Sequence, residues 1–324
     1  MPRTAQTGRA KSVAAPKGGG GWLKGLIVVL VIAGVLAAAA FWAINKLGNL
    51  SIFHSSGCTA TSTAGSTDLD LDQAKYASTI AAVGVSMNVP AFGIRVAEAT
   101  AMQESKLHDV TYGDRDSLGL FQQRPSQGWG TSQQILDPVY ATTRFYRALL
   151  NVPNWQALSL TAAAQAVQHS GSPTAYAQHE QPATVVTSVF SGTATSGLGC
   201  TLDGPTFPAQ SKGADRLLVA RGQSVVDEMR AEFGTANVGK ITGIAADGKS
   251  FGVAAPTGVV GGQAATREWS YANWLAAQAE SMGIAQVSYD GKTWSASDGG
   301  SGWKADGSAY AISTSVHVVL VSGG

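Results

Sequence analysis

A charge-free apolar run near the amino terminus constrains this chain more than any other feature. Residues 26–44 contain no charged side chain, and as a helix they would extend about 28 Å, close to the hydrocarbon thickness of a bilayer. A helix in the core of a soluble domain keeps a polar face, which this run lacks. We therefore predict one transmembrane helix within residues 22–46.

The flanks of this run predict its orientation. Five basic side chains precede it with no acidic residue among them, and an excess of Lys and Arg marks the cytoplasmic side. Residues 1–21 are expected to form a disordered cytoplasmic tail, with the chain after residue 46 outside the cell. A cleaved signal peptide is the alternative, because residues 37–40 are all alanine, but the run exceeds a usual signal core, so we favour an uncleaved anchor in the cell membrane.

The two cysteines, Cys58 and Cys200, lie far apart, a spacing suited to closing one domain rather than to holding a metal. In an oxidising exterior they are expected to pair, the alternative being two free thiols. The five histidines lack metal-ligand spacing, so we predict no metal and no cofactor. A net charge of +1 gives no indication of a nucleic-acid partner.

Two segments rich in Ser, Thr and Gly divide the exterior chain. Residues 47–67 and 191–214 are expected to be linkers, leaving one domain at 68–190 and an accessory domain at 215–324.

The first of these domains is predicted to be mainly α-helical. Apolar residues recur there at helical spacing, and Asp137 before Pro138 matches an N-cap followed by proline at the first helical position. A long polar connection at residues 111–133 is of the kind that often carries function. The predicted helices cover residues 72–85, 90–103, 138–150 and 160–169.

The second domain alternates between helical and strand patterns, which predicts a small α+β unit. Its predicted helices cover residues 217–233 and 269–282, and its predicted strands residues 239–245, 286–289 and 315–321.

Glu104 stands at the predicted end of an apolar helix, directly before the long polar connection. Cleaving a glycosidic bond requires an acid that protonates the leaving oxygen, held in a partly buried place. Glu98, six residues earlier, would face another side of the helix, and we expect it to be a solvated charge. Glu104 is therefore the candidate general acid.

The residues around Glu104 resemble a known family. Glu104-Ser105 is followed, fifteen residues after the acid, by Gly-Leu-Phe-Gln at 119–122 and then by Pro125. This run resembles the lytic transglycosylases and related lysozyme-like peptidoglycan hydrolases, most closely membrane-anchored forms of high-GC Gram-positive bacteria. The resemblance covers about residues 72–180 and implies a lysozyme-like fold for the first domain.

The resemblance implies that Glu104 acts first as general acid and then as base on the bond between N-acetylmuramic acid and N-acetylglucosamine. It also implies a groove lined by Ser117, Gln122 and Gln123. Further candidate substrate contacts are Ser105, Tyr112, Asp116, Gln168 and Tyr176.

One later stretch departs from the family pattern. Where the family carries Ala-Tyr-Asn-Ala-Gly on a helix, residues 166–170 read Ala-Val-Gln-His-Ser, so that valine replaces tyrosine and Gln168 replaces asparagine. Tyr176, shortly after, is a candidate to supply the lost hydroxyl.

Two mechanisms stay open. If Asp114 or Asp116 activates a water, the product is that of hydrolysis. Without a second carboxylate, the resemblance implies attack by the 6-hydroxyl of muramic acid, which leaves a 1,6-anhydro end. We favour a structural role for Asp114 with Arg115, in a turn and an ion pair.

The accessory domain faintly resembles zinc D-Ala-D-Ala carboxypeptidase-like domains, but of their metal ligands only His317 is matched. We expect a non-catalytic module there. The sequence thus predicts a membrane-anchored enzyme that acts on peptidoglycan strands, with secretion or conjugation machinery as possible protein partners. The alternative is a lysozyme-like scaffold that binds the wall without cleaving it.

Overall fold

The four helices predicted before residue 170 are present, and all but α3 (Ala91–Ser105) begin after a residue whose side chain caps the helix. The computed structural model describes residues 56–204, 206–214, 216–308, 310–311 and 313–323. Helix α2 (Leu71–Ser86) begins after Asp70, whose Oδ1 accepts a hydrogen bond from Gln73 N at 2.8 Å. Helix α5 (Pro138–Leu150) begins after Asp137 as predicted, and the Asp137 carboxylate accepts from the next free backbone N–H groups. These caps satisfy donors that a helix start leaves unpaired.

The other elements of this part follow the same order along the chain. They are β1 (Gly57–Ser62), β2 (Gly65–Leu69), α3 (Ala91–Ser105), η1 (Pro125–Gln127), α4 (Ser132–Ile135), η2 (Trp155–Ala157), α6 (Leu160–Gln168), η3 (Ala175–His179), α7 (Glu180–Phe190) and β3 (Leu198–Thr201).

The later part of the chain alternates helices and strands. Its elements are α8 (Ala220–Phe233), η4 (Thr235–Asn237), β4 (Ile241–Thr242), β5 (Ser250–Val253), α9 (Gly262–Ala277), α10 (Ala279–Met282), β6 (Ile284–Tyr289), β7 (Lys292–Ser295), η5 (Gly299–Ser301), β8 (Lys304–Ala305) and β9 (Val316–Leu320).

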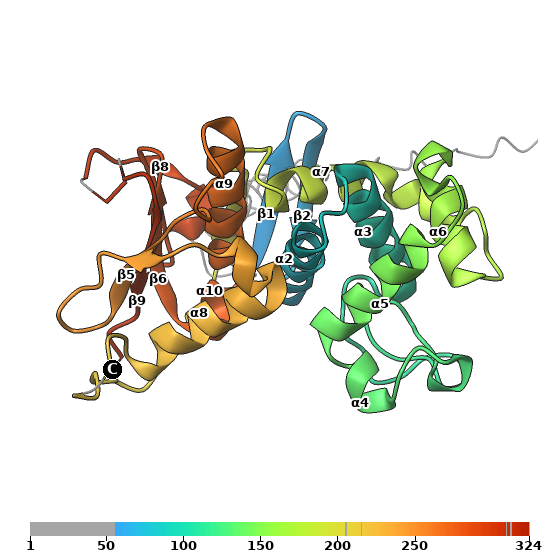
Figure 1. The fold of residues 1–324 in the computed structure, drawn as a ribbon, viewed down its shortest axis with the longest axis horizontal. Helices are drawn as coiled ribbons and strands as arrows, with labels where there is room; N and C mark the ends of the chain where they lie inside the picture. The colour runs from blue at the N-terminus through green and yellow to red at the C-terminus, as the bar shows by residue number, and fades with distance from the viewer. Residues whose placement is uncertain (1–55, 205, 215, 309, 312, 324) are drawn as a thin grey trace, which may run out of the picture. The chain divides into compact units, whose positions relative to one another are not determined.

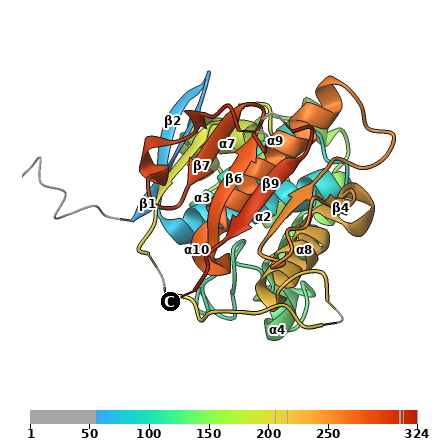
Figure 2. The ribbon, with the colours of Figure 1, turned by 90° about the vertical axis from the view of Figure 1, so that its left-hand side faces the viewer.

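The described strands form two antiparallel sheets (Figures 1 and 2). The first has the order β2-β1-β3, and the second has the order β4-β5-β9-β6-β7-β8. The predicted fold class is therefore wrong in its main part: the described chain is a mixed α/β protein, not a mainly α lysozyme-like domain with a small α+β appendage. Part of the error came from residues 57–67 and 198–201, which lie within the predicted linkers 47–67 and 191–214 although they pair as strands.

No helix within the described residues is long and apolar enough to cross a bilayer. The predicted span at residues 26–44, with its basic tail, lies outside the described residues.

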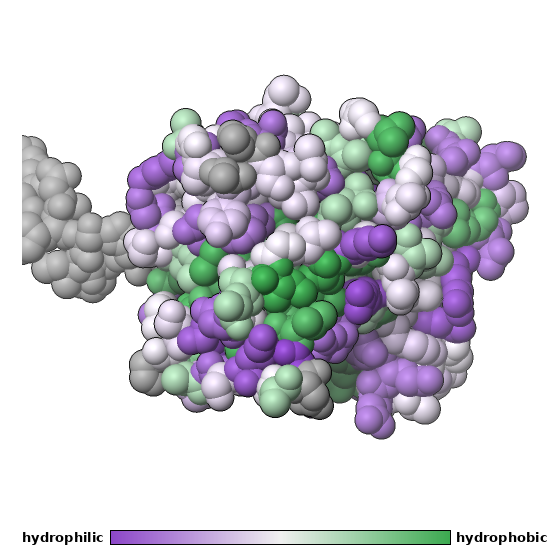
Figure 3. Space-filling model, turned by 60° about the vertical axis from the view of Figure 1, so that its left-hand side comes forward, coloured by the Kyte–Doolittle hydropathy of each residue, from purple (hydrophilic) through white to green (hydrophobic). Residues whose placement is uncertain are grey.

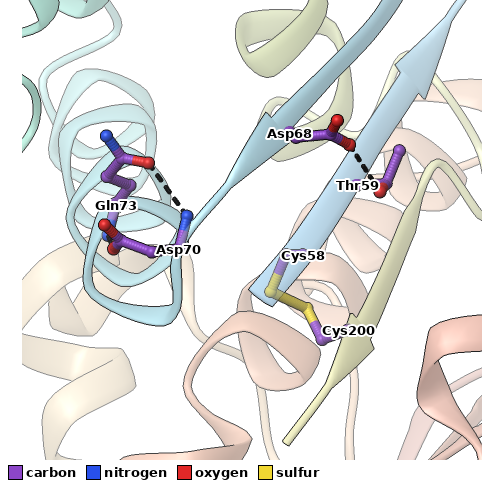
Figure 4. Close-up of a disulfide and its surroundings, with 6 residues drawn as sticks. All are labelled: Cys58, Thr59, Asp68, Asp70, Gln73 and Cys200. Carbon is purple, nitrogen blue, oxygen red and sulfur yellow. Dashed lines mark hydrogen bonds between the residues drawn. A yellow bond between two sulfur atoms is a disulfide. The ribbon is translucent and has the colours of Figure 1, made fainter. Parts of the chain in front are cut away.

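The predicted disulfide between Cys58 and Cys200 is present (Figure 4). The two cysteines lie opposite each other on β1 and β3, and both are buried. The bond thus closes a loop that contains all helices from α2 to α7. Beside it, the Thr59 hydroxyl donates to Asp68 Oδ1 at 2.8 Å, which adds a side-chain link across β1 and β2.

We expect Cys58→Ser to lower the free energy of unfolding by about 3–5 kcal/mol, because the crosslink limits the entropy of the unfolded chain. Urea unfolding followed by tryptophan fluorescence measures this loss. Reductant should destabilise the wild type to the same degree and leave Cys58→Ser unchanged. A wild type indifferent to reductant under unfolding conditions would contradict a stabilising role.

The second sheet buries one face against α9 (Figure 2). Phe251, Val318, Val287 and Trp294 lie side by side across β5, β9, β6 and β7, and none is exposed. On the other face Val319, half-buried, lies between polar neighbours on β5 and β6. Figure 3 brings this part of the molecule forward and shows an apolar patch within a largely hydrophilic surface. The alternation of strand side chains therefore builds one apolar face and one mixed face.

Helix α2 joins the helices of the first part of the chain to those of the later part. It contacts α3, α5 and α7 from the first part, and α8 and α9 from the later part. At this junction Glu232 on α8 accepts from the Thr79 hydroxyl on α2 at 2.9 Å and from the Trp274 indole on α9. Asn273 on α9 donates to Val189 O on α7 at 2.8 Å. All these groups are buried, so each bond is made where water cannot replace it.

Burial raises the pKa of Glu232 from 4.5 to about 8, against the lowering effect of its two donors. The folded protein therefore keeps a proton that the unfolded chain has lost above pH about 4.5, so stability falls as the pH rises toward 8. The loss from this residue is on the order of 5 kcal/mol. Glu232→Gln should flatten that part of the pH profile of unfolding measured in urea, whereas the exposed control Glu180→Gln should follow the wild type. Equal slopes in all three proteins would refute this assignment.

Candidate functional site

Glu104 is the penultimate residue of α3 and is half-buried. The helix ends directly after it because Lys106 and Leu107 both adopt the left-handed conformation, with φ of 56° and 59°. Their N–H groups donate to Met102 O at 3.2 Å and to Ala101 O at 3.1 Å. This closing turn fixes the backbone on which the acid stands.

The structure brings Tyr176 onto Glu104. Tyr176 lies in η3, is fully buried, and its hydroxyl donates to Glu104 Oε1 at 2.7 Å. Burial, and then the hydrogen bond to Glu104, raise the pKa of Tyr176 well above its usual value. The phenol therefore stays protonated and remains a donor to the acid. The hydroxyl proposed from the sequence as a sugar contact thus orients the carboxyl.

Ser105 connects the helix end to the Gly-Leu-Phe-Gln run. Its hydroxyl donates to Leu120 O at 2.8 Å and accepts from His108 N at 3.3 Å. The run itself is the tip of a hairpin, since Leu118 and Gln123 pair as an isolated bridge. Ser105 is therefore placed to position this hairpin against Glu104.

The hairpin uses its apolar residues as an anchor. Leu120 and Phe121 are fully buried, and Phe121 stacks on Phe145 of α5 with ring centroids 4.6 Å apart. Gln168 at the end of α6 donates to Phe121 O at 2.8 Å. Gln122, half-buried, donates to Tyr112 O at 3.3 Å. Both predicted amides thus hold the hairpin in place.

The remaining predicted substrate contacts, Gln123, Ser117 and Tyr112, differ in how far they are exposed to solvent. Gln123 is 2% exposed and donates to Ala141 O at 3.1 Å, and Ser117 is buried as well. Tyr112 is 74% exposed. Of these three, Tyr112 is the side chain open to a ligand from solvent.

The Asp116 carboxylate forms its hydrogen bonds within its own loop. It accepts from Arg124 Nε at 2.7 Å and from Ser126 N at 2.8 Å. These bonds, the one from Arg124 foremost, hold the pKa of Asp116 well below its usual range. Asp114 has a side chain 91% exposed, 3.9 Å from Arg115. Neither carboxylate has a hydrogen bond to Glu104 or Tyr176 within the described part of the chain.

The expectation for Glu98 is wrong. Its side chain is fully buried within α3, and neither carboxyl oxygen has a hydrogen-bond partner among the described residues. Burial raises the pKa of Glu98 well above its ordinary value, so the carboxyl is held neutral. The helix is surrounded on more sides than its weak amphipathic pattern indicated, because it packs against α2, α5, α6 and α7.

A polar group next to the acid was not found from the sequence. Gln103 Oε1 lies 3.1 Å from Gln178 Nε2 and 3.1 Å from His179 Nε2. Burial lowers the pKa of His179, which favours the neutral ring. A separation of 75 residues between Gln103 and Gln178 leaves no local pattern that could have indicated this contact.

A polar pocket of about 790 Å³ is lined in part by the hairpin. Gln122 and Gln168 line it together with Trp129, but Glu104 does not. Gln168 bonds Phe121 O, and Ser105, the neighbour of Glu104, bonds Leu120 O. The helix end that carries the acid and the pocket therefore both adjoin the same hairpin.

Within the described residues no three His, Cys, Asp or Glu side chains come together as a metal site. His317 lies in β9, nearly buried, with the Tyr310 ring stacked on it at a centroid distance of 4.0 Å. No family model matches this chain, and no curated protein sequence matches it either. The case for a function therefore rests on the residues themselves.

A substitution at Gly119 tests whether the position of the hairpin is fixed by its contacts. Its φ is +74°, and an added Cβ would come within 2.7 Å of Ile135 O. Gly128 has a similar φ of +77° with open space around it, which makes it a matched control. We expect Gly128→Ala to cost about 1 kcal/mol and Gly119→Ala about 3 kcal/mol in urea unfolding, because only the latter adds a clash to backbone strain. Equal losses would show that the hairpin is free to move.

Proposed function

We propose that this chain cleaves the bond between N-acetylmuramic acid and N-acetylglucosamine in peptidoglycan, with Glu104 as its only catalytic carboxyl. The observation that carries the proposal is the 2.7 Å hydrogen bond from the buried Tyr176 hydroxyl to Glu104 Oε1. Such a bond fixes one carboxyl oxygen. The other, Oε2, has no hydrogen-bond partner among the described residues and is left to exchange a proton with a substrate.

In the first step Glu104 donates a proton to the glycosidic oxygen, the bond from that oxygen to C1 breaks, and the acetamido oxygen of the same muramic acid attacks C1. In the second step the Glu104 carboxylate takes a proton from the 6-hydroxyl, whose oxygen attacks C1 and releases the acetamido group. The carboxyl ends protonated as it began. Tyr176 keeps the carboxyl in one orientation through both proton transfers.

The surroundings favour this one-acid route over hydrolysis by a second carboxylate. Asp116 is ionised and already accepts from Arg124 and Ser126. Asp114 projects into solvent beside Arg115. A general base must reach its water and the sugar at the same time, and neither residue offers a carboxylate held toward Glu104. The product expected is a 1,6-anhydromuramic end.

The proposed location follows from the sequence. A span at residues 26–44 with a basic cytoplasmic flank would hold the catalytic part at the outer face of the cell membrane. There it would reach the wall from within, as a secretion or conjugation apparatus requires when it opens a path.

Glu104→Gln and Tyr176→Phe test the proposal. The full chain in mild detergent is incubated with purified peptidoglycan, and the soluble products are identified by mass spectrometry. We expect anhydro-ended muropeptides from the wild type, a loss of roughly a thousandfold in kcat for Glu104→Gln, and a loss of roughly tenfold to a hundredfold for Tyr176→Phe with little change in KM.

Asp227→Asn on α8 and Tyr310→Phe are the matched controls, since both side chains are exposed and neither belongs to α3, η3 or the hairpin. Reducing ends in place of anhydro ends would replace the one-acid route by hydrolysis. Binding to peptidoglycan with no product, alike in wild type and Glu104→Gln, would reject the enzyme and support the wall-binding scaffold.

A further inference from the structure

We propose that the polar pocket beside the hairpin binds carboxylate groups carried by the glycan strand, and so selects muramic-acid polymers over neutral ones. The inference rests on the proposed function and deepens it. The pocket has a volume of about 790 Å³, and among the described residues that line it there is no Asp or Glu. Four arginines line it: Arg115, Arg124, Arg144 and Arg147.

These arginines differ in how far their charge is already balanced. Arg124 is paired with Asp116 at 2.7 Å. In the described part of the chain, the acidic partner of Arg115 is the exposed Asp114, at 3.9 Å. Arg144 donates to Gly128 O at 2.9 Å through Nη2, while its buried Nε has no hydrogen-bond partner among the residues that the structure describes. Arg147, exposed in the last turn of α5, forms no ion pair within the described residues. The pocket therefore holds an excess of positive charge.

The chemistry of the lining indicates what kind of anion fits. A guanidinium binds a carboxylate through two parallel hydrogen bonds. The amides of Gln122, Gln127 and Asn151 and the ring of Trp129 provide the hydrogen bonds and the flat apolar surface that a sugar uses. A carboxylate attached to a sugar satisfies both halves of this lining.

The hairpin relates the pocket to the acid. Gln122 on the hairpin lines the pocket, while Leu120 O on the same hairpin accepts from the neighbour of Glu104. A strand cut at Glu104 thus presents its adjoining units to the arginines. Each muramic-acid unit carries a carboxylate from one of two sources. Where a stem peptide is attached, the lactyl carboxyl is consumed in the amide bond and the peptide supplies the carboxylates; where the peptide is absent, the lactyl ether supplies one. A polymer of N-acetylglucosamine carries none.

The test measures binding to the full chain bearing Glu104→Gln, which prevents turnover. Three ligands are compared by calorimetry: peptidoglycan strands with stem peptides, strands from which an amidase has removed the peptides, and chitohexaose. Arg115→Gln with Arg147→Gln should lower affinity for the anionic strands by roughly tenfold or more and leave chitohexaose unchanged. Added salt should weaken the same interaction. Arg216→Gln, exposed and outside the pocket, is the control.

The outcomes separate the two proposals. An arginine effect on peptide-free strands assigns the lactyl carboxylate, and an effect confined to intact strands assigns the stem peptide; either supports the inference. Equal losses for chitohexaose and anionic strands, or no loss at all, would overturn it while leaving cleavage at Glu104 intact. A wild type that neither binds nor cleaves any of the three would remove the proposed function, and this inference with it.

Discussion

The fold depends on one helix that is packed on nearly every side. Helix α2 touches five other helices, and this is possible because its buried positions are mostly small: Ala74, Ala77, Ala81, Ala82 and Gly84. A Cβ on Gly84 would lie 2.8 Å from the Tyr146 hydroxyl, which is closer than atoms in contact normally come. The site therefore has no room for even one methyl group. Close approach of helices around a narrow central one allows a single continuous core. The six-stranded sheet and the Glu104 region are both built outward from it.

Rigidity at the candidate site has the same origin. α3, which carries Glu104, packs on α2, and the hairpin beside the acid is anchored by Phe121 against α5, another neighbour of α2. The Tyr176 side chain is fully buried, and its hydroxyl donates a hydrogen bond to Glu104. In the mechanism proposed above Glu104 would give and then take a proton at one atom, and a fixed frame favours such a role because misplacement by even about 1 Å lowers rates steeply.

The sequence predicts those features of the fold that interactions within one turn of the chain decide. Asp137 before Pro138 predicted the start of α5, because capping involves only the next turn of the chain. The hairpin strands β1 and β2 were missed, since their stability comes from β3 and the disulfide far along the chain. Glu98 was misjudged for a related reason: helical periodicity predicts one buried face, and α3 is enclosed on several.

The sequence by itself indicated Glu104 as the candidate acid, the Gly-Leu-Phe-Gln run that follows it and the cysteine pair, because each is a matter of residue type and spacing. Only the tertiary structure decided the role of each neighbour. In the fold the Tyr176 hydroxyl donates to Glu104, the Ser105 hydroxyl donates to the hairpin, and Asp116 accepts from Arg124. Four arginines, from the loop after α3 and from α5, line one pocket. The physical reason is that a hydrogen bond or a shared charge depends on distance in space, and packing brings residues together whatever their separation in the chain.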